Sequence, residues 1–376
     1  MDDSTKDLFN DFDRGTISRR RLLQALGLAA VTAPAVAWAQ GRCGGDNASK
    51  PGCDTTPAKA PFDPTGWKTI ALDHFTMQVA DYKKEAGYYS ALMNWKPRMD
   101  DGNKAVLDIG DFGNVVIRGG YVAPPTPPAP PRPAGDSAAG GGRGGRGGGG
   151  GAPRAPRMAN WDSFCWGIDN WDKKKVEAAL KSRGLNPVAG NELGVDYFEV
   201  KDPGGFTCKI SDGKRTMRNV VKAQNISEPE PFDHTGWKTV WLDHLSFQCP
   251  DYKATVAFYE ALLGWHGTGD EGSQNETEIG NIGNALIRGG GPPRPGAAAG
   301  ERRMASLDHI AFGLSPWDTD GVLAELTKRG LTGRADTGGH GEIHEERAKY
   351  KSYHTTTPNG FDLQISNGNR ATRQVR

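Results

Sequence analysis

The sequence predicts an α+β protein of two tandem domains, each with two units made of a strand, a helix and further strands. One observation is an internal duplication: TGWKTIALDHFTMQVADYKKEAGYYSALMNW from Thr65 matches TGWKTVWLDHLSFQCPDYKATVAFYEALLGW from Thr235 at a constant offset of 170 residues. A second is that a strand-and-helix pattern restarts inside each copy, at WDSFCWGIDNW and LDHIAFGLSPW. A third is a turn, DPGGFTCKIS or TPNGFDLQIS, that leads into a closing strand. Four similar units explain all three.

The helices in the second half of each copy have recognisable ends. Asp172 and Asp318 stand at the N-cap position before the two helical patterns. Gly184 and Gly330 follow the patterns as C-terminal stops. We therefore expect a helix between each Asp and the Gly that follows it.

Segments rich in Pro and Gly separate the folded parts. An insert at 121–158 interrupts domain 1, which spans 65–215, and a linker at 216–234 leads to domain 2 at 235–370. A Gly/Pro-rich linker at 40–64 precedes domain 1. Such composition buries too little apolar surface to offset the entropy lost on ordering. We therefore expect the insert to be disordered.

The overall composition narrows the range of partners. The chain has 376 residues, of which 36% are hydrophobic, enough for two ordinary cores. Its 46 basic and 45 acidic residues leave a net charge of +1, so no global field attracts a polyanion. We expect a small-molecule ligand or substrate and no nucleic acid, and leave assembly into a homo-oligomer open.

The N-terminus carries an export signature. Ser18, Arg19 and Arg20 precede a short apolar run that ends in Ala37-Trp38-Ala39, a small-x-small cleavage site. This order resembles a twin-arginine signal peptide spanning residues 1–39. The apolar run is too short to span a bilayer comfortably. We expect a periplasmic or secreted protein with no stable membrane anchor after cleavage.

Export also bears on the five cysteines. An oxidising compartment would allow Cys43 and Cys53 to form a disulfide that closes a Gly-rich loop. Cys165, Cys208 and Cys249 lie in alternating apolar runs, where we expect them to be buried.

The tripeptide LDH occurs three times, ending at His74, His244 and His309, while the fourth equivalent place reads WDS and ends at Ser163. Strand alternation places His244, Ser246 and Gln248 on one face and apolar residues on the other. The apolar face should meet the helix. The histidine face then looks toward an open, ligand-accepting side.

These features resemble the vicinal oxygen chelate superfamily, which includes glyoxalase I, bleomycin-resistance proteins and extradiol dioxygenases. The resemblance rests on the four strand-helix-strand units, the DH dipeptides and the Pro-x-Gly-Phe closing turns over roughly residues 65–370. It implies that two βαβββ modules pair in each domain to form a cupped mixed sheet. It also implies that the first and last strands of the modules supply the metal ligands. The fold hosts several chemistries, so function must be argued from the site.

The two domains differ at the ligand positions that this resemblance implies. Domain 1 has His74, Arg118, Ser163 and Lys209. Cationic side chains offer no lone pair and repel a metal ion, so we expect no metal there and a structural role for His74. Domain 2 has His244, Arg288, His309 and Gln364. His244, His309 and Gln364 could form a three-ligand set with open positions, as in two-domain extradiol dioxygenases whose N-terminal domain is catalytically empty.

The match is incomplete in two ways. Gln364 stands where the dioxygenase pattern has Glu, which leaves Asp362, and His340, Glu342 and Glu345 in the preceding loop, as alternative ligands. The extradiol signature also has a His and a Tyr before the closing turn, near His344 and His354. These histidines are candidate catalytic acids or bases. A solvated polar loop is the competing interpretation.

Two functions remain open. One is an exported, metal-dependent enzyme of glyoxalase or dioxygenase type, acting through domain 2 on a small oxygen-chelating substrate such as an aromatic diol. Fe(II), Mn, Zn and Ni are all compatible with it. The other is a metal-free binding protein of the bleomycin-resistance type. In either case we expect Arg288, Ser246 and Gln248 to face the ligand, with Arg288 suited to a carboxylate or phosphate.

Overall fold

The computed structural model describes residues 55–123, 158–214, 231–289 and 304–373. The predicted signal peptide, the Cys43 and Cys53 pair, and most of the insert and interdomain linker lie outside the described residues. Tyr121 and Met158, at the two ends of the insert, belong to the folded part, since their backbone amides donate to Val79 and Asn359. None of the helices described is long and apolar enough to cross a membrane.

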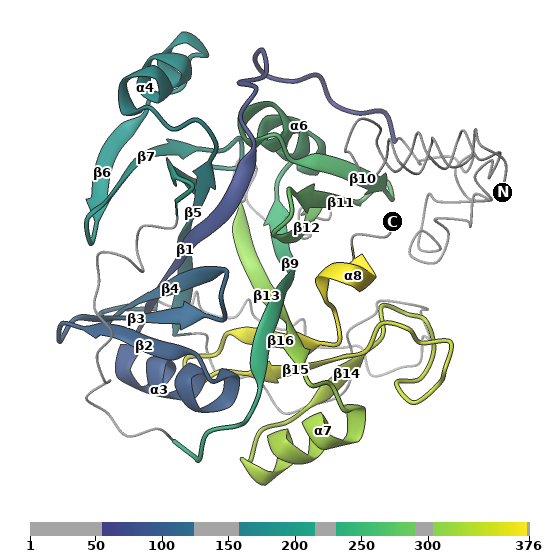
Figure 1. Ribbon diagram of the computed structural model, residues 1–376. Helices are drawn as coiled ribbons and strands as arrows, with labels where there is room; N and C mark the ends of the chain where they lie inside the picture. Colours follow the sequence, from purple (N-terminus) through teal and green to yellow (C-terminus); the bar gives the residue numbers. More distant parts are fainter. Residues whose placement is uncertain (1–54, 124–157, 215–230, 290–303, 374–376) are drawn as a thin grey trace, which may run out of the picture. The chain divides into compact units, whose positions relative to one another are not determined.

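The described chain contains two eight-stranded mixed sheets with the same strand order, β2-β3-β4-β1-β5-β8-β7-β6 and β10-β11-β12-β9-β13-β16-β15-β14 (Figure 1). The strands of the first sheet are β1 (Thr69–Val79), β2 (Lys96–Asp100), β3 (Lys104–Ile109), β4 (Gly113–Arg118), β5 (Ala159–Ile168), β6 (Val188–Glu192), β7 (Val195–Lys201) and β8 (Thr207–Asp212). Those of the second are β9 (Lys238–Cys249), β10 (His266–Asp270), β11 (Gln274–Ile279), β12 (Gly283–Gly289), β13 (Ser306–Ser315), β14 (Arg334–Asp336), β15 (Ser352–Thr356) and β16 (Asp362–Ser366). Each sheet joins two βαβββ modules, which confirms the predicted fold class.

One helix follows the first strand of every module: α3 (Tyr82–Met93), α4 (Lys173–Ser182), α6 (Tyr252–Leu263) and α7 (Thr319–Lys328), with a short α8 (Arg370–Arg373) near the end. The Asp172 side chain accepts from the Lys175 amide, which confirms the expected cap, whereas Asp318 makes no side-chain cap hydrogen bond. Gly184 and Gly330 follow the C-caps with φ of 74° and 71°, a left-handed conformation that suits glycine.

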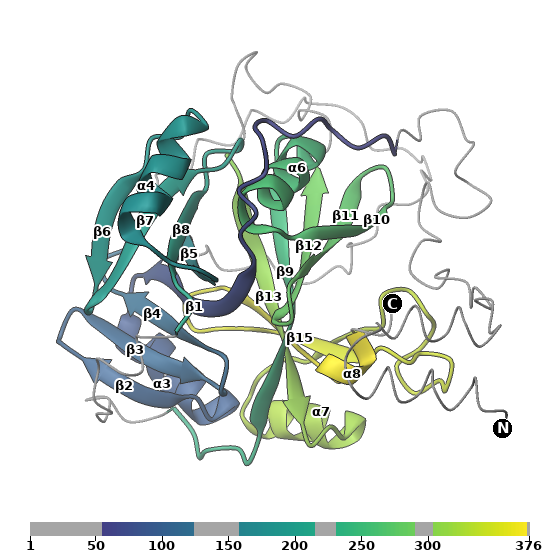
Figure 2. The same cartoon turned by 45° about the horizontal axis from the view of Figure 1, so that its top comes forward.

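The two modules of each domain join through their first strands. β1 pairs antiparallel with β5, and β9 pairs antiparallel with β13, while each also pairs parallel with the last strand of its own module (Figure 2). On the apolar faces, Phe75, Met77 and Val79 are fully buried against the helix side, as the alternation predicts. Cys165, Cys208 and Cys249 are buried free thiols, which confirms that prediction too.

The helix-side faces of the two domains share one hydrophobic core. The contacts between them are reciprocal: the Trp95 indole donates to Thr239 (2.8 Å) and the Trp265 indole donates to Thr69 (3.0 Å). Gly110 and Gly280 approach the opposite domain so closely that an added Cβ would lie 2.1 Å from the Thr239 carbonyl oxygen and 2.5 Å from that of Thr69. This repeated close approach requires the glycine of the repeated IG dipeptide.

The closing turns of the domains also dock onto the opposite domain. The Asn359 side chain donates to the Glu85 carboxylate (2.9 Å) and to the Asp81 carbonyl (3.0 Å), and accepts from the Asp81 amide (3.0 Å). At the equivalent turn of domain 1, the Asp202 carboxylate accepts from the Phe206 amide (2.8 Å) and from the Tyr259 hydroxyl (3.1 Å). The two cupped sheets are therefore fixed by one continuous interdomain core.

Candidate metal centre

Three strands at the centre of the second sheet bring the predicted ligands onto one face. Ala311 on β13 is in register with His244 on β9 and with Gln364 on β16, so these three residues form one row across the sheet. His309 lies one row along, opposite Ser246. Side chains in register on paired strands point to the same side. The structure thus places all three predicted ligands together on the concave face of domain 2.

The two histidines present their ring nitrogens to each other. His244 Nε2 and His309 Nε2 are 3.3 Å apart, and the residues are only 4% and 5% exposed. With metal–nitrogen bonds of about 2.1 Å, this separation corresponds to an angle of roughly 100° at a shared ion. The pair therefore fits two adjacent positions on one metal.

A carboxylate lies beside Nδ1 of each histidine. Asp243 Oδ1 lies 3.4 Å from Nδ1 of His244, and Asp308 Oδ2 lies 2.9 Å from Nδ1 of His309. A carboxylate at Nδ1 keeps the proton on that nitrogen and leaves the Nε2 lone pair for a metal. The Asp of each LDH tripeptide supplies this partner. The repeated Asp of the LDH tripeptide is therefore the sequence signal for this role.

Gln364 is oriented by its amide nitrogen. Nε2 donates to the Tyr350 hydroxyl (3.0 Å) and to the Ser352 hydroxyl (2.8 Å), and the residue is 2% exposed. Its Oε1 is buried and has no hydrogen-bond partner within the described residues. Burying a carbonyl oxygen without a partner is costly, so this oxygen calls for a ligand of its own. A metal shared with the two histidines would satisfy it.

A second set of polar groups adjoins the histidine pair. His309, His354 and Asp362 each offer a ligand atom within 4.8 Å of the others. His354 lies between two carboxylates, with Nδ1 at 3.2 Å from Asp362 and Nε2 at 3.4 Å from Asp336. Burial opposes the charged imidazolium, but the hydrogen bonds to Asp336 and Asp362 outweigh it and raise the pKa of His354 to about 9. Asp362 also binds Arg334 (2.6 Å), which leaves it less available as a ligand.

The remaining predicted residues lie at different distances from this cluster. Ser246 is fully buried on the same face, and its hydroxyl has no partner in the described chain, whereas Gln248 further along β9 is exposed. Arg288 faces the same side from β12, in register with Gln248. The structure does not bring His344 to the centre: it is exposed and faces Asp320 at 3.6 Å.

The loop before β15 contributes to the site a residue that its sequence does not reveal. Its alternative ligands, His340, Glu342 and Glu345, do not join either of the potential ligand groups found among the described residues. Its contribution is instead Tyr350, through the bond to Gln364. A tyrosine outside any motif gives no sequence signal for this role.

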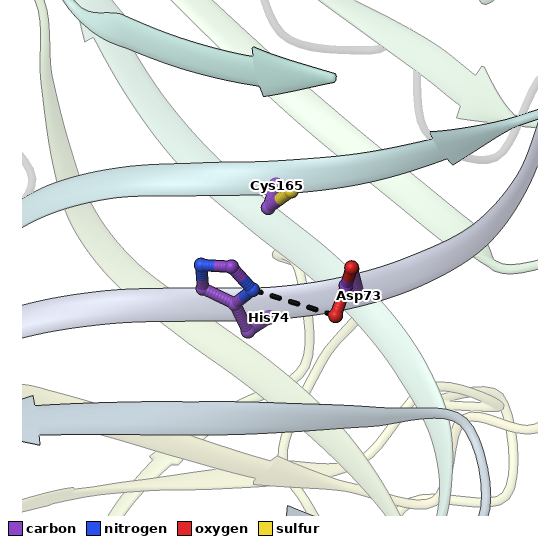
Figure 3. Close-up of side chains that lie close together, drawn as sticks. All are labelled: Asp73, His74 and Cys165. Atoms are coloured by element: carbon purple, nitrogen blue, oxygen red, sulfur yellow. Dashed lines mark hydrogen bonds and ion pairs between the residues drawn. The ribbon is translucent and has the colours of Figure 1, made fainter. Parts of the chain in front are cut away.

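In domain 1, Asp73, His74 and Cys165 also lie within 4.8 Å of one another (Figure 3). Burial and the nearby Asp73 charge hold the pKa of the Cys165 thiol well above its usual range, whereas a metal ligand must be the thiolate. Asp73 is already bonded to Ser211 (2.9 Å), and Asp243 repeats this bond with Ser366 in domain 2. We therefore interpret this group as a structural hydrogen-bond unit common to both domains rather than a metal site.

The cup of domain 1 is filled by its own side chains. Lys209 occupies the row position of Gln364, is 2% exposed, and lies 4.7 Å from the centre of the Tyr197 ring. Val106, Val116 and Val195 form a separate apolar cluster on this face. In domain 2, the positions equivalent to Val106 and Val116 lie 170 residues further on and are Glu276 and Leu286.

Salt bridges connect further charged side chains on this face of domain 1. Glu192 binds both Lys104 (2.7 Å) and Arg118. Burial raises the pKa of the Glu192 carboxyl, but Lys104 and Arg118 more than offset this and hold it below its ordinary value. Among the described residues, the charged side chains of this face in domain 1 are therefore largely paired with one another.

Solved structures share this arrangement. Over 80% of this chain and 82% of the other, it superposes on the Mn(II)-bound glyoxalase from Novosphingobium aromaticivorans with a TM-score of 0.51 and 15% identity. A catechol 2,3-dioxygenase matches over 81% and 89% of the two chains, with a TM-score of 0.51 and 13% identity. A variant of homoprotocatechuate 2,3-dioxygenase from B. fuscum matches over 84% and 75%, with a TM-score of 0.51 and 15% identity.

This chain has the fold of the vicinal oxygen chelate superfamily. No family model and no curated protein matches the sequence. At such low identity the vicinal oxygen chelate fold is what these structures establish, so any function must be argued from the residues of the site itself.

Proposed function

We propose that domain 2 binds a divalent metal through His244, His309 and Gln364, and that the protein is a metal-dependent enzyme acting on a small oxygen-chelating substrate. The observation that carries this proposal is the convergence of the two Nε2 atoms, 3.3 Å apart, on the same buried face as the unpartnered Gln364 Oε1. The vicinal oxygen chelate fold supports it, because the glyoxalase of this fold is a Mn(II)-bound protein.

The metal would act as a Lewis acid that binds and polarises two adjacent oxygens of the substrate. His244, His309 and Gln364, from strands β9, β13 and β16, would hold the ion, and three protein ligands would leave coordination positions for the substrate. His354 lies next to His309, with a ring-to-ring distance of 5.1 Å, and is the residue placed to hold or deliver a proton. Asp336 and Asp362 fix its ring, so it acts beside the metal rather than as a ligand.

Metal content of the purified protein tests the proposal directly. Wild type should bind about one equivalent of Mn(II) or Fe(II), and His244→Ala and His309→Ala should each remove it, since two remaining donors hold a divalent ion poorly. Gln364→Glu should tighten binding by roughly 10-fold, because it adds the negative charge that an amide lacks. Plasma mass spectrometry and competitive chelator titration measure both effects.

His74→Ala is the matched control, because it removes the equivalent histidine from domain 1. Metal content should not change in this variant. Loss of metal from His74→Ala together with its retention in His309→Ala would show that the site has been placed in the wrong domain.

A metal-free binding protein is the second candidate. The neutral side chain of Gln364 favours it, since an amide binds a divalent ion more weakly than a carboxylate. The ion pairs of His354 with Asp336 and Asp362 favour it too, since they hold this ring without a metal. Wild type that takes up no metal under any loading condition would establish this function instead.

The proposal includes export. The twin-arginine pattern at Arg19 and Arg20 supports a route that carries folded, cofactor-loaded proteins, which suits a metal site buried inside a sheet.

A further inference from the structure

The Asp of each LDH tripeptide is the extra residue of a β-bulge. On β9, the pairing with both neighbouring strands passes from Leu242 directly to His244, which leaves Asp243 inserted between them. Asp308 on β13 and Asp73 on β1 are inserted in the same way. A bulge interrupts the alternation of a strand and re-aims the side chain at that point. Each of these Asp side chains therefore lies next to its histidine instead of on the opposite face.

In domain 2 the bulged carboxylate of Asp243 links two strands that carry proposed ligands. Its Oδ1 lies beside Nδ1 of His244, while its Oδ2 accepts a hydrogen bond from the Ser366 hydroxyl. Ser366 lies two residues after Gln364 on β16, and both Asp243 and Ser366 are fully buried. Burying a carboxylate is costly unless positive charge and hydrogen bonds compensate for it. The place of Asp243 is therefore suited to a positive charge held by His244.

All three proposed ligands are neutral. The imidazoles of His244 and His309 and the amide of Gln364 bring no negative charge to a divalent ion. A buried cation needs compensating anions nearby, and a carboxylate hydrogen-bonded to a metal-binding histidine is one arrangement that provides them. Asp243 and Asp308 occupy this place, one beside each histidine. Their two negative charges equal the charge of a divalent ion.

Domain 1 balances the same buried carboxylate with a fixed cation. Asp73 is 1% exposed and Lys209 is 2% exposed. Both charges act on the thiol of Cys165: burial and then Asp73 raise its pKa, while Lys209 opposes them. Gln364 is the counterpart of Lys209, because each lies two strands from the first histidine of its domain in the same row. Domain 2 thus keeps the carboxylate, at Asp243, but has a neutral amide in place of the ammonium.

We propose that Asp243 and Asp308 provide the negative charge of the metal centre through the two histidines, in place of a carboxylate ligand. This inference rests on the proposed metal-dependent function and assigns both as positioning residues rather than ligands. A carboxylate that accepts from Nδ1 raises the basicity of Nε2 and holds the ring in one orientation. The charge and the direction of the lone pair then both favour the ion, which makes an amide at Gln364 compatible with a divalent metal.

Competitive chelator titration with Zn(II) on the purified protein measures this contribution as an affinity. Asp243→Asn should weaken Zn(II) binding roughly 10- to 100-fold, the range found for groups that hydrogen-bond to metal-binding histidines. Asp308→Asn should weaken it less, because this carboxylate is 42% exposed and solvent screens its charge. Asp73→Asn, the matched control at the bulge of domain 1, should leave the affinity unchanged.

A charge placed at Gln364 separates this role from a purely structural one. Gln364→Glu should raise the Zn(II) affinity by a larger factor in the Asp243→Asn background than in wild type, because it restores the charge that the first substitution removed. A defect confined to the shape of the bulge on β9 would not be repaired from β16, and the gain would then be equal in both backgrounds. If Asp243→Asn does not fold, Asp308→Asn with and without Gln364→Glu gives the same comparison at a partly exposed carboxylate.

The outcomes separate this inference from the proposed function. An unchanged Zn(II) affinity in Asp243→Asn, or an equal gain from Gln364→Glu in both backgrounds, would show that the carboxylates do not compensate the ion, while the metal function stands. A loss of affinity in Asp73→Asn as large as in Asp243→Asn would trace the effect to general stability and overturn the inference. Wild type that binds no Zn(II) would overturn the metal function, and this inference with it.

Discussion

A buried carboxyl at the interdomain junction should make the stability of this protein depend on pH. Asp202 is 5% exposed and contacts Tyr259 of the other domain. Burial raises the pKa of Asp202 from 3.8 to about 6, against the opposing effect of its hydrogen bonds from Phe206 and Tyr259. The equivalent position at the other junction is the neutral Thr357, whose hydroxyl accepts from the Phe361 amide in the same way.

Proton linkage gives the direction in which the free energy of unfolding changes with pH. The folded protein holds this proton more tightly than the unfolded chain, so Asp202 carries no penalty below about pH 4, and its cost grows as the pH rises through about 6. A difference of about two pKa units corresponds to about 3 kcal/mol in the free energy of unfolding. Asp202→Asn keeps an acceptor for the Phe206 amide and removes the ionisable proton. This variant should therefore lack the loss of stability between pH 4 and pH 7.

Urea denaturation at a series of pH values measures the difference in the free energy of unfolding between wild type and variant. The contributions of other titrating groups cancel in this difference. The difference should be small near pH 4 and grow in favour of Asp202→Asn by about 3 kcal/mol at pH 7.5. Asp196→Asn is the control: that carboxyl is exposed and its pKa is lowered by Lys173 and Asn191, so it should show no such trend. A difference that stays flat across this range would refute the reasoning.

Three further outcomes are expected. Asn359→Ala should lower the free energy of unfolding by about 3 kcal/mol in urea denaturation. It removes three interdomain hydrogen bonds and leaves the buried Glu85 carboxylate poorly paired. A change under 1 kcal/mol would contradict this. Tyr350→Phe should weaken metal binding several-fold in chelator titration by freeing the Gln364 amide to rotate, without changing metal content at saturation; unchanged affinity would show that Ser352 alone suffices. Replacing Arg19 and Arg20 by Lys should retain the precursor in the cytoplasm on cell fractionation, and normal export would exclude the twin-arginine route.

The fold was accessible from the sequence because its signals are local and repeated. The 170-residue duplication, the strand alternation around His74 and His244, and the glycine stops each specify an element without reference to the rest of the chain. Strand periodicity then assigned the histidines to the concave face, and the register of β9, β13 and β16 places His244, His309 and Gln364 on one face of the sheet.

The residues around the ligands could not be found in this way. Tyr350 and Asp336 reach the site from a loop and an edge strand, and their roles depend on tertiary distances that no spacing encodes. His344 illustrates the opposite case, since its place near a motif position suggested catalysis although its side chain points toward Asp320 at the surface. Local pattern identifies which face a residue occupies, but not which loop closes over it.

The concave faces of the two domains share the same strand arrangement but carry different charged side chains. In domain 1 the cation of Lys209 occupies the row where domain 2 has the unpartnered oxygen of Gln364. A fixed ammonium needs no diffusible ion and excludes one by repulsion, so this cup stays folded without a ligand. Replacing it with an amide leaves a buried oxygen that the protein itself does not satisfy. At this row, the buried and unpartnered oxygen occurs in domain 2 and not in domain 1, which is the pattern expected if the second repeat holds the proposed metal.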